Sequence, residues 1–597
     1  VQVEESSDED KIRFDTGGTE RVVIDSNGIT MSSGTVNGLG ILADTTNFED
    51  SILISQNAST GTLDAASNNT GLGDSVFAAL TSGDNNVGIG ADSLKGLTTG
   101  GANVAVGFAA LEANTTASNN VAVGFTALLA NTTGSFNVAV GKDALAANTT
   151  AAQNTAVGGV SMASNTTGAN NTALGTSALN ANTTASNNVA VGTNALVLNT
   201  TGSNNTAVGM QSLDANTTGT TNTAIGKDSL GANTTGSANT GLGHNALEAN
   251  TTASDNTGVG KNALRANTTG GENTALGKDA LSANTTGTNN LSLGSDTMLA
   301  NTTGSNNVAV GYGALQVNST ADDNTAVGDR ALFNNTTGAH NSALGHDALK
   351  ANTTGESNVA VGSQSLDANT TGLNNVAVGR QALDNSTTGS RNVAVGTNAL
   401  DANTTADHNT AVGDGALKAN TTGAANIAVG SAAGNLITTG SQNVILGGYS
   451  GNHQGLDVRT ESDGKAVVSD GAGDIAFHNA VGTAILAGNV DVTGDSSSAN
   501  AFALADGAVT GLFGGGNGFS GVFILNDFTS SGEVAMFITG GGVITLVKQT
   551  GVNFEVGSSP ASGKYGLFMD GTTVKLKSNR GASASFRLLS LRTRTGQ

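Results

Sequence analysis

A 17-residue repeat constrains the fold of this chain more than any other feature. Its opening Asn recurs from Asn69 to Asn443 in 22 steps of 17 residues, which gives 23 copies without an insertion. A Gly four residues later, such as Gly107 or Gly124, keeps the same spacing. Stretches such as VAVG and NTTG combine β-branched residues with Asn, Thr and Gly, which disfavour helix. We therefore predict that each repeat is one coil of a β-solenoid.

Two columns of each coil are predicted to face inward. The third residue after the opening Asn is always aliphatic, and the eighth is almost always Leu or Met. Small residues lie between them, such as Ala105 on a first predicted strand and Ala110 on a second. Stacking the aliphatic columns from coil to coil forms a narrow apolar core. The predicted core includes Val106, Leu111, Val123, Leu128, Val259 and Leu264.

The NTTG stretch is predicted to bend the chain. Asn tolerates a left-handed backbone and bonds locally, and Gly adopts positive φ without steric cost. Stacked in register, Asn114, Asn131 and Asn148 should form an amide ladder that satisfies buried polar groups. Gly107 and Gly124 are assigned to the turn and ladder positions as well. Charged residues are confined to the variable slots, which we expect to face water.

Composition excludes several partners. The net charge is −22, which repels phosphate backbones, so we expect no nucleic acid partner. The absence of Cys leaves stability to packing. The most apolar region, 501–525, holds Asp506, Asn517 and many glycines, so no membrane insertion is expected. The chain starts at Val1 rather than Met, which fits a trimmed piece of a longer protein.

A single stack of such coils has a thin core. Small residues bury little apolar surface for each ordered residue, and packing several chains together offsets that deficit. Homo-oligomers usually adopt closed cyclic symmetry. We therefore expect an oligomer of identical chains.

Units such as NVAVG..AL.ANTTG resemble the head repeats of trimeric autotransporter adhesins and the shafts of phage tail fibres. The resemblance covers roughly residues 66–453. It implies an all-β fold, a left-handed parallel β-roll or β-solenoid of 17-residue coils, assembled as a trimeric fibre. The unit is longer than the typical adhesin head unit, and the chain has no heptad stalk or membrane-anchoring strands of the adhesin kind.

The flanking sequences favour the phage-fibre hypothesis. Residues 10–34 and 464–494 look like the β-hairpin segments of phage fibre proteins, with alternating apolar residues around Gly, Asp and Asn turns. We predict four domains: 1–65, a β-rich N-terminal cap and attachment segment; 66–453, the solenoid shaft; 454–497, a β connector; and 498–597, a C-terminal β tip domain.

No catalytic or metal-binding constellation is predicted, and no cofactor is expected. His244 and His346 share a column, but six coils separate them, so we interpret them as polar surface residues. The repeated Asn-Thr-Thr is formally a glycosylation acceptor, but turn chemistry explains it. A flat Thr array for binding ice is a further alternative, which the position of Thr at a bend disfavours. No enzymatic activity is expected; the remaining alternative of this kind is a depolymerase within the C-terminal domain.

The predicted function is a structural and adhesive fibre, most simply a phage tail fibre on a virion. The alternative is a bacterial surface adhesin or extracellular filament subunit. A homotrimer is expected to attach to a phage tail, baseplate or other fibre protein at its N-terminal end. Its C-terminal end is expected to bind a host surface glycan or outer-membrane protein. The candidate receptor-binding residues are Phe513, Phe519, Tyr565, Arg592 and Arg594.

Overall fold

The computed structural model describes residues 51–54 and 60–453 with their side chains, and most of 456–475. Beyond these it describes the backbone of the strands in both flanks. The chain forms two compact units, Val1–Thr388 and Gly389–Gln597, which we describe separately. All regular elements in the described part are strands, so the fold is all-β.

The first unit begins with two antiparallel groups of strands. β1 (Gln2–Val3), β2 (Ile12–Thr16), β3 (Thr19–Asp25) and β4 (Gly28–Met31) pair in that order. β5 (Gly34–Val36), β6 (Leu39–Thr45) and β7 (Phe48–Ser55) pair antiparallel. β7 then runs parallel to β8 (Ala66–Ser67) and to β9 (Thr70–Leu72), the strand of the first coil.

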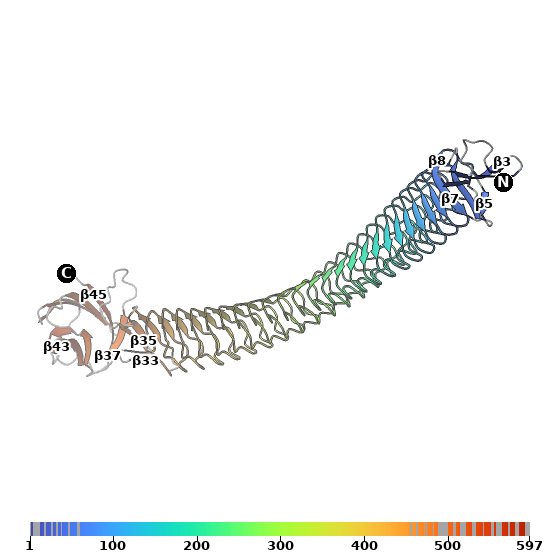
Figure 1. Ribbon diagram of the computed structural model, residues 1–597. Helices are drawn as coiled ribbons and strands as arrows, with labels where there is room; N and C mark the ends of the chain where they lie inside the picture. Colours follow the sequence, from blue (N-terminus) through green and yellow to red (C-terminus); the bar gives the residue numbers. More distant parts are fainter. Residues whose placement is uncertain are drawn as a thin grey trace. The chain divides into compact units, whose positions relative to one another are not determined.

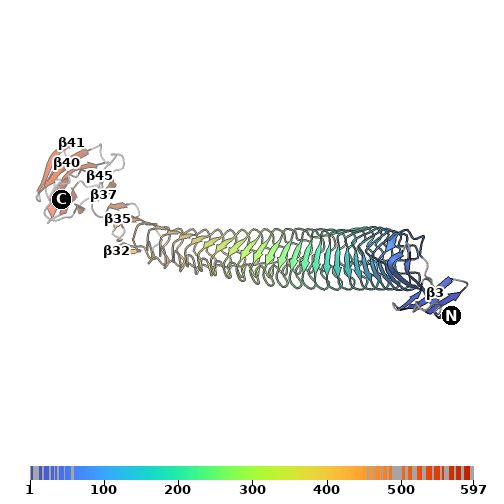
Figure 2. The same cartoon turned by 45° about the horizontal axis from the view of Figure 1, so that its top comes forward.

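From β9 to β27 (Val376–Val378), each coil contributes a three-residue strand that begins 17 residues after the previous one. Neighbouring strands pair parallel and in register, so that Val104, Ala105 and Val106 face Val121, Ala122 and Val123. Figures 1 and 2 show these strands stacked side by side along the unit. The predicted parallel β-solenoid of 17-residue coils is therefore confirmed.

The second strand predicted for each coil is absent from the described coils. The segment that carries Ala110 and Leu111 is a turn, because Ala109 (φ 54°) and Leu111 (φ 55°) are left-handed. Alternating left-handed residues prevent an extended run. The segment still stacks on its neighbour, since the Leu111 amide donates to the Ala127 carbonyl at 3.0 Å.

The interior of the coil is built differently from the predicted core. Leu111, Leu128 and Leu264 are fully buried, as predicted. Val106, Val123 and Val259 are only half-buried and lie on the outer side of the strand, so their assignment to the core is wrong.

The alternation of the strand explains the error. The opening Asn103 and the middle residue Ala105 are both fully buried in the interior of the coil. Successive side chains of a strand point to opposite faces, so Val104 and Val106 must point outward once Ala105 points inward. The small residue is therefore the one that meets the buried Leu column.

The opening Asn residues form a first amide ladder that the sequence did not predict. The Asn120 amide N–H donates to Asn103 Oδ1 at 3.1 Å, and Asn154 repeats the contact on Asn137 at 3.0 Å. The Asn103 side-chain Nδ2 also donates to the Ala117 carbonyl at 3.0 Å. Each buried amide thus fastens its coil to a neighbouring coil.

The predicted ladder of NTTG asparagines is confirmed as a second one. Asn148 Nδ2 donates to Asn131 Oδ1 at 2.8 Å, and Asn131 does the same to Asn114 at 3.3 Å. The same Nδ2 atoms donate to the carbonyl three residues later, for example from Asn148 to Ala151 at 3.0 Å. These side chains are fully buried, so the hydrogen bonds satisfy groups that water cannot reach.

The Gly that ends each strand and the Gly of the NTTG stretch have different structural roles in the coil. Gly107 and Gly124 end the strand with φ of 140° and 141°, and an added Cβ would overlap the carbonyl of the next coil's Gly. Glycine is therefore required there on two grounds. The NTTG Gly134 has no left-handed φ, and Asn114 has none either, so the predicted reason for this bend is wrong. Gly134 instead allows close approach to the Ala151 carbonyl.

The second unit begins with coils of the same kind. β28 (Val393–Val395), β29 (Thr410–Val412), β30 (Ile427–Val429) and β31 (Val444–Leu446) pair parallel. β34 (Ala466–Ser469) continues parallel to β31, and β35 (Ile475–Ala480) and β36 (Thr483–Leu486) follow antiparallel. β32 (Asn452–His453) and β33 (Leu456–Asp457) form a short antiparallel pair. Tyr449 is fully buried here and donates to the Leu456 carbonyl at 2.8 Å.

Two sheets follow in the same unit. The first has the order β37 (Asn500–Leu504), β45 (Ala584–Leu591), β39 (Gly521–Asp527), β40 (Glu533–Gly540) and β41 (Val543–Thr550). The second has the order β38 (Val509–Phe513), β44 (Thr573–Asn579), β43 (Lys564–Asp570) and β42 (Phe554–Val556). All pairings are antiparallel except β42 with β43.

Candidate functional site

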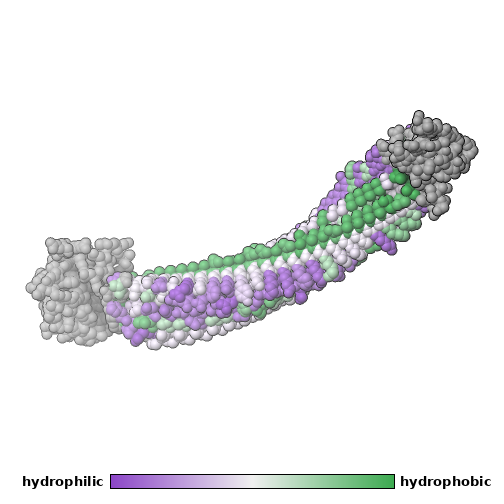
Figure 3. All heavy atoms as spheres, in the orientation of Figure 1, coloured by the Kyte–Doolittle hydropathy of each residue, from purple (hydrophilic) through white to green (hydrophobic). Residues whose placement is uncertain are grey.

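The outer side of the strands presents an apolar surface. We call the residue three positions after each opening Asn the aliphatic column; it includes Val106, Val123 and Val259. Where the residue is Leu the exposure is high, reaching 48% at Leu174 and 51% at Leu344. In Figure 3 hydrophobic residues form bands that run along the coils. Exposed aliphatic side chains in an unbroken row are unusual on a surface that meets only water.

A second outward position, directly after the opening Asn, varies along the shaft. It is Val in the strands β11 (Val104–Val106), β12 (Val121–Val123) and β13 (Val138–Val140). It is Thr in each strand from β17 (Thr206–Val208) to β21 (Thr274–Leu276). The apolar surface is therefore wider in the first group of coils than in the second.

Aromatic side chains lie beside the wide part of this surface. Phe108 and Phe125 follow the Gly of adjacent coils, and their rings stack with centroids 5.2 Å apart and planes 18° apart. Both rings are about half exposed, and Phe136 is 60% exposed. Sequence reasoning missed these residues, although an aromatic residue in a slot that elsewhere holds Lys, Thr or Ser is a recognisable signal.

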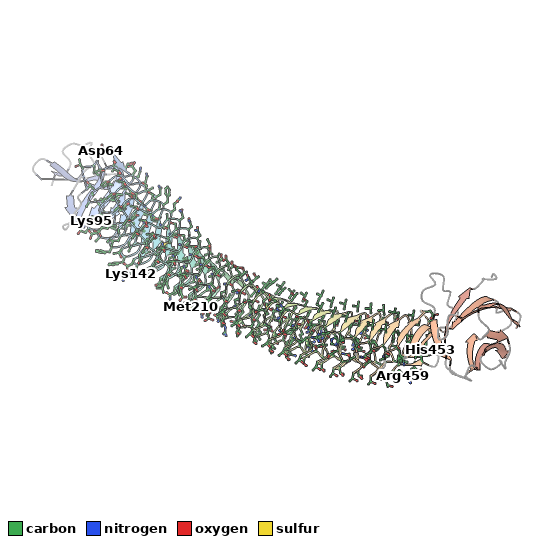
Figure 4. All side chains as sticks on the ribbon, turned by 180° about the vertical axis from the view of Figure 1, so that it is seen from behind. Asp64, Lys95, Lys142, Met210, His453 and Arg459 are labelled. Atoms are coloured by element: carbon green, nitrogen blue, oxygen red, sulfur yellow. The ribbon has the colours of Figure 1, made fainter. Side chains whose placement is uncertain are left out.

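The variable slots carry the charged residues, as predicted. Lys142 is 70% exposed and pairs with Asp143 at 3.6 Å, and Lys278 pairs with Asp279 at 3.0 Å. Lys142 and Met210, four coils apart in one column, project from the same edge of the shaft in Figure 4. Exposed ion pairs of this kind contribute little stability, so these slots are free to vary.

One ion network is more buried than the rest. The Asp347 side chain is 6% exposed and lies 3.1 Å from Arg330 Nε and 3.4 Å from Lys350 Nζ. Arg330 also contacts His346 Nε2 at 3.3 Å. The opposite charges of Arg330, Lys350 and Asp347 pair with one another across adjacent coils. The network therefore connects coils and leaves no unpaired charge for a ligand.

Two carboxyl groups have perturbed pKa values. Burial raises the pKa of Asp214 above its ordinary value, and burial likewise raises that of Asp367. Both belong to the slot that follows the buried Leu, where the side chain lies against the coil surface. The charge of Asp228 adds to the rise in the pKa of Asp214, and the charge of Asp347 adds to that of Asp367.

A shallow hollow of about 460 Å³ lies on the early coils, with Lys95 and Glu112 at its edge. Lys95 already pairs with Asp92 at 3.0 Å and lies 3.8 Å from Glu112. Gly96, Ala113, Leu129 and Ala130 complete its lining, so it offers an apolar floor and few polar groups.

The described residues hold no group of three or more His, Asp or Glu side chains placed to bind a metal ion. Nor do they include a helix with the length and apolar character needed to cross a bilayer. His244 and His346 lie six coils apart on the outer slots, so they do not meet within this chain.

The Asn-Thr-Thr stretches are not open to modification at Asn. Asn148 and its equivalents are fully buried, and their Nδ2 atoms are engaged in the ladder. The hydroxyl of the first Thr forms a hydrogen bond to the next coil, since Thr132 Oγ1 donates to the Thr149 carbonyl at 3.1 Å. Only the second Thr, such as Thr133, is exposed, which leaves one Thr row rather than a two-row array.

The predicted receptor-binding residues stay predictions. Phe513 ends β38 and Tyr565 lies on β43, whose backbones are described while their side chains are not. Phe519, Arg592 and Arg594 lie outside the described residues.

Fold and surface together define a parallel β-solenoid repeat protein with two amide ladders and an exposed apolar strand face. Comparisons with protein-family models, with curated proteins and with solved structures gave no match.

Proposed function

We propose that this protein is a structural fibre subunit whose solenoid shaft separates an attachment end from a binding end. The observation that carries the proposal is the shaft itself. Its interior is filled by Leu, Ala and hydrogen-bonded Asn, so the coils leave no room for a substrate inside. Repeated coils with similar shallow surfaces suit spacing better than chemical discrimination.

The proposed assembly is a homotrimer, and the aliphatic column supports self-association. A row of exposed Val and Leu side chains recurs once per coil, at the strand spacing of about 4.8 Å. A second copy of this chain has the same axial period, so each row can meet an equivalent row over many coils. A partner without that period loses the match after a few coils. Three-fold closure is the finer part of the proposal, and it rests on the resemblance of the repeats to fibre proteins.

The setting we propose is a phage virion, with the trimer as a tail fibre. The N-terminal end would join a tail, baseplate or other fibre protein. The C-terminal sheets would contact a host glycan or outer-membrane protein. The NVAVG and NTTG motifs and the hairpin-like flanking segments support this setting. A bacterial surface adhesin or extracellular filament subunit is the second candidate, because the same motifs occur in adhesin heads.

Sedimentation equilibrium of the full chain tests the assembly. The expected mass is three times 58.4 kDa, and a monomer over the whole concentration range would refute the homotrimer. Electron microscopy tests the fibre, for which a compact globule is the contradictory result. Binding of the full chain to host cells, with Arg592→Ala and Arg594→Ala variants beside it, tests the binding end. Unchanged binding by both variants removes these residues from the proposal.

A further inference from the structure

The outward strand face is not uniform, and one part of it combines Val at both outward positions with exposed Phe rings. Val also fills both positions in β26 (Val359–Val361), β27 and β28, but no Phe lies in the slots beside those strands. We define the valine patch as Val104, Val106, Val121, Val123, Val138 and Val140 together with Phe108, Phe125 and Phe136. In each of its three strands both outward residues are Val, and the middle Ala is buried. In Figure 3 two hydrophobic bands run side by side along the N-terminal part of the shaft.

The middle coils provide a comparison within the same chain. In β20 (Thr257–Val259) and β21 the first outward residue is Thr, and the flanking slots hold charged residues. Those flanking residues are Asp255, Lys261, Glu272 and Lys278. The six equivalent slots beside the valine patch hold one charged residue, Lys142 beside the third strand. The other five hold uncharged residues: Phe108, Phe125, Phe136, Ala102 and Asn119.

Charge points to the identity of the occupant. Each chain carries a net charge of −22, so two copies repel each other wherever their acidic slots meet. The three strands of the valine patch carry no charged side chain, and the one charged residue in their flanking slots is the basic Lys142. Docking there therefore avoids repulsion between acidic slots and limits the desolvation of ions. The half-exposed Phe rings add apolar area of the type that anchors interfaces.

Area limits what the patch can do alone. Its three coils span about 14 Å along the stack, and the seven residues from Ala102 to Phe108 would span at most about 20 Å across it if fully extended. The resulting footprint of roughly 300 Å² is less than half of the roughly 800 Å² per partner found in stable interfaces. The contact must therefore continue along the aliphatic column, with the patch as its strongest part.

We propose that copies of this chain are held together chiefly at the valine patch, while the Thr-bearing coils from β17 to β21 contribute less. This inference rests on the proposed self-association and adds its location. It predicts that assembly depends on a few coils near one end of the shaft rather than evenly on all of them.

The test uses variants that the repeat itself shows to be compatible with folding. Thr occupies the first outward slot at Thr206 and the slot after Gly at Thr176, so Thr fits both places. The patch variant of the full chain combines Val121→Thr, Val138→Thr and Phe125→Thr. The matched control combines Val359→Thr and Val376→Thr, the same substitution at the same outward position in two coils that have no Phe beside them. Circular dichroism verifies that each variant keeps its β-sheet signal.

Sedimentation equilibrium then measures self-association of all three proteins. We expect the patch variant to dissociate at protein concentrations at least about tenfold higher than the native chain does, and the control to change this by less than about threefold. A monomeric native chain refutes the proposed assembly and this inference with it. A native oligomer that the patch variant reproduces with equal strength refutes the inference alone. Normal assembly with lost host-cell binding also refutes it, and assigns the patch to a receptor.

The sign of that concentration shift matters, because weaker self-association requires more protein to keep the oligomer together. The patch variant is therefore expected to show a lower fraction of oligomer than the native chain at every common concentration. A higher fraction contradicts the inference as directly as an unchanged one.

Discussion

Replacing Ser386 with Asn should stabilise the shaft. Ser386 stands in the column of the second amide ladder, 17 residues after Asn369 and 34 after Asn352. Asn369 Nδ2 donates to Asn352 Oδ1 at 2.8 Å, so the ladder is intact up to this point. Asn369 Oδ1, however, is buried and receives no hydrogen bond. An Asn at position 386 would place an Nδ2 donor where every preceding ladder residue has one.

The magnitude follows from the lost hydrogen bond. A buried acceptor without a donor costs about 1–3 kcal/mol, and a typical new hydrogen bond returns about 0.5–1.5 kcal/mol net. Ser386 is itself fully buried, so the larger side chain must use space that the neighbouring coils provide for Asn at the same place. We therefore expect a gain of about 1 kcal/mol for each chain.

Hydrogen exchange measured by mass spectrometry is the suitable assay. A long repeat protein opens locally, so a single melting temperature averages over coils that the substitution never touches. A gain of about 1 kcal/mol corresponds to about fivefold slower exchange where exchange reports local opening. The slowing should be confined to peptides that cover the coils of Asn369 and Ser386.

Asn352→Ser is the matched control. It removes the Nδ2 that donates to Asn335 Oδ1 at 2.8 Å, which should create the same defect in an intact part of the ladder. Exchange around Asn335 should become faster by a comparable factor. The reasoning is refuted if Ser386→Asn leaves exchange unchanged or faster while Asn352→Ser accelerates it, because the ladder would then matter but position 386 would not accommodate the amide.

Three further substitutions test the assignment of the faces, the strand-ending Gly and the buried carboxyl. Leu264→Ala should lower the free energy of unfolding by about 2–5 kcal/mol, whereas Val259→Thr in the same coil should change it by less than about 1 kcal/mol in the unassembled chain. Equal effects in urea denaturation would contradict the assigned faces. Gly124→Ala should accelerate hydrogen exchange in its own and the next coil, because φ is 141° there and the Cβ would overlap the Gly141 carbonyl; unchanged exchange is the adverse result. Asp214→Asn should increase hydrogen-exchange protection of the peptides that cover its coil at neutral pH and leave protection unchanged below the ordinary pKa of 3.8. Burial raises the pKa of Asp214 in the folded chain, so the native coil loses stability as the pH rises from 3.8 through the raised pKa. A change in protection that does not depend on pH would show that the effect has another cause.

Much of the shaft follows from the sequence because its period is exact enough to count. The period gives the coil length, and the buried Leu111 column follows from the regular recurrence of Leu. The ladder of Asn114 and its equivalents follows from stacking identical amides in register. A strict repeat makes these inferences safe, since each coil tests the pattern again.

Which face of the strand points inward could not be predicted from the sequence, because two orientations are compatible with the same residues. In Asn103–Val104–Ala105–Val106 either the Val pair or the Asn and Ala pair can face inward under the two-residue alternation. Hydrophobicity favours the Val pair, but the buried Asn103 amide bonds its neighbours in the stack and selects the other choice. The exposed Val106 column was therefore mistaken for core, and the candidate surface for assembly was missed with it.

The two ladders also explain why 23 coils pass without an insertion. One extra residue in a coil displaces the following side chains by about 3.3 Å along the chain. A displacement of that size breaks a hydrogen bond that must hold its donor and acceptor within about 3.2 Å. Each interruption leaves a buried amide unmatched, as Asn369 shows at Ser386 and Asn420 shows at its Oδ1, where Ile437 follows in the column. Every interruption leaves a buried amide without a hydrogen-bond partner, which lowers the stability of the fold. An unbroken ladder has the fewest such amides, and a constant spacing of 17 residues is what keeps the ladder unbroken.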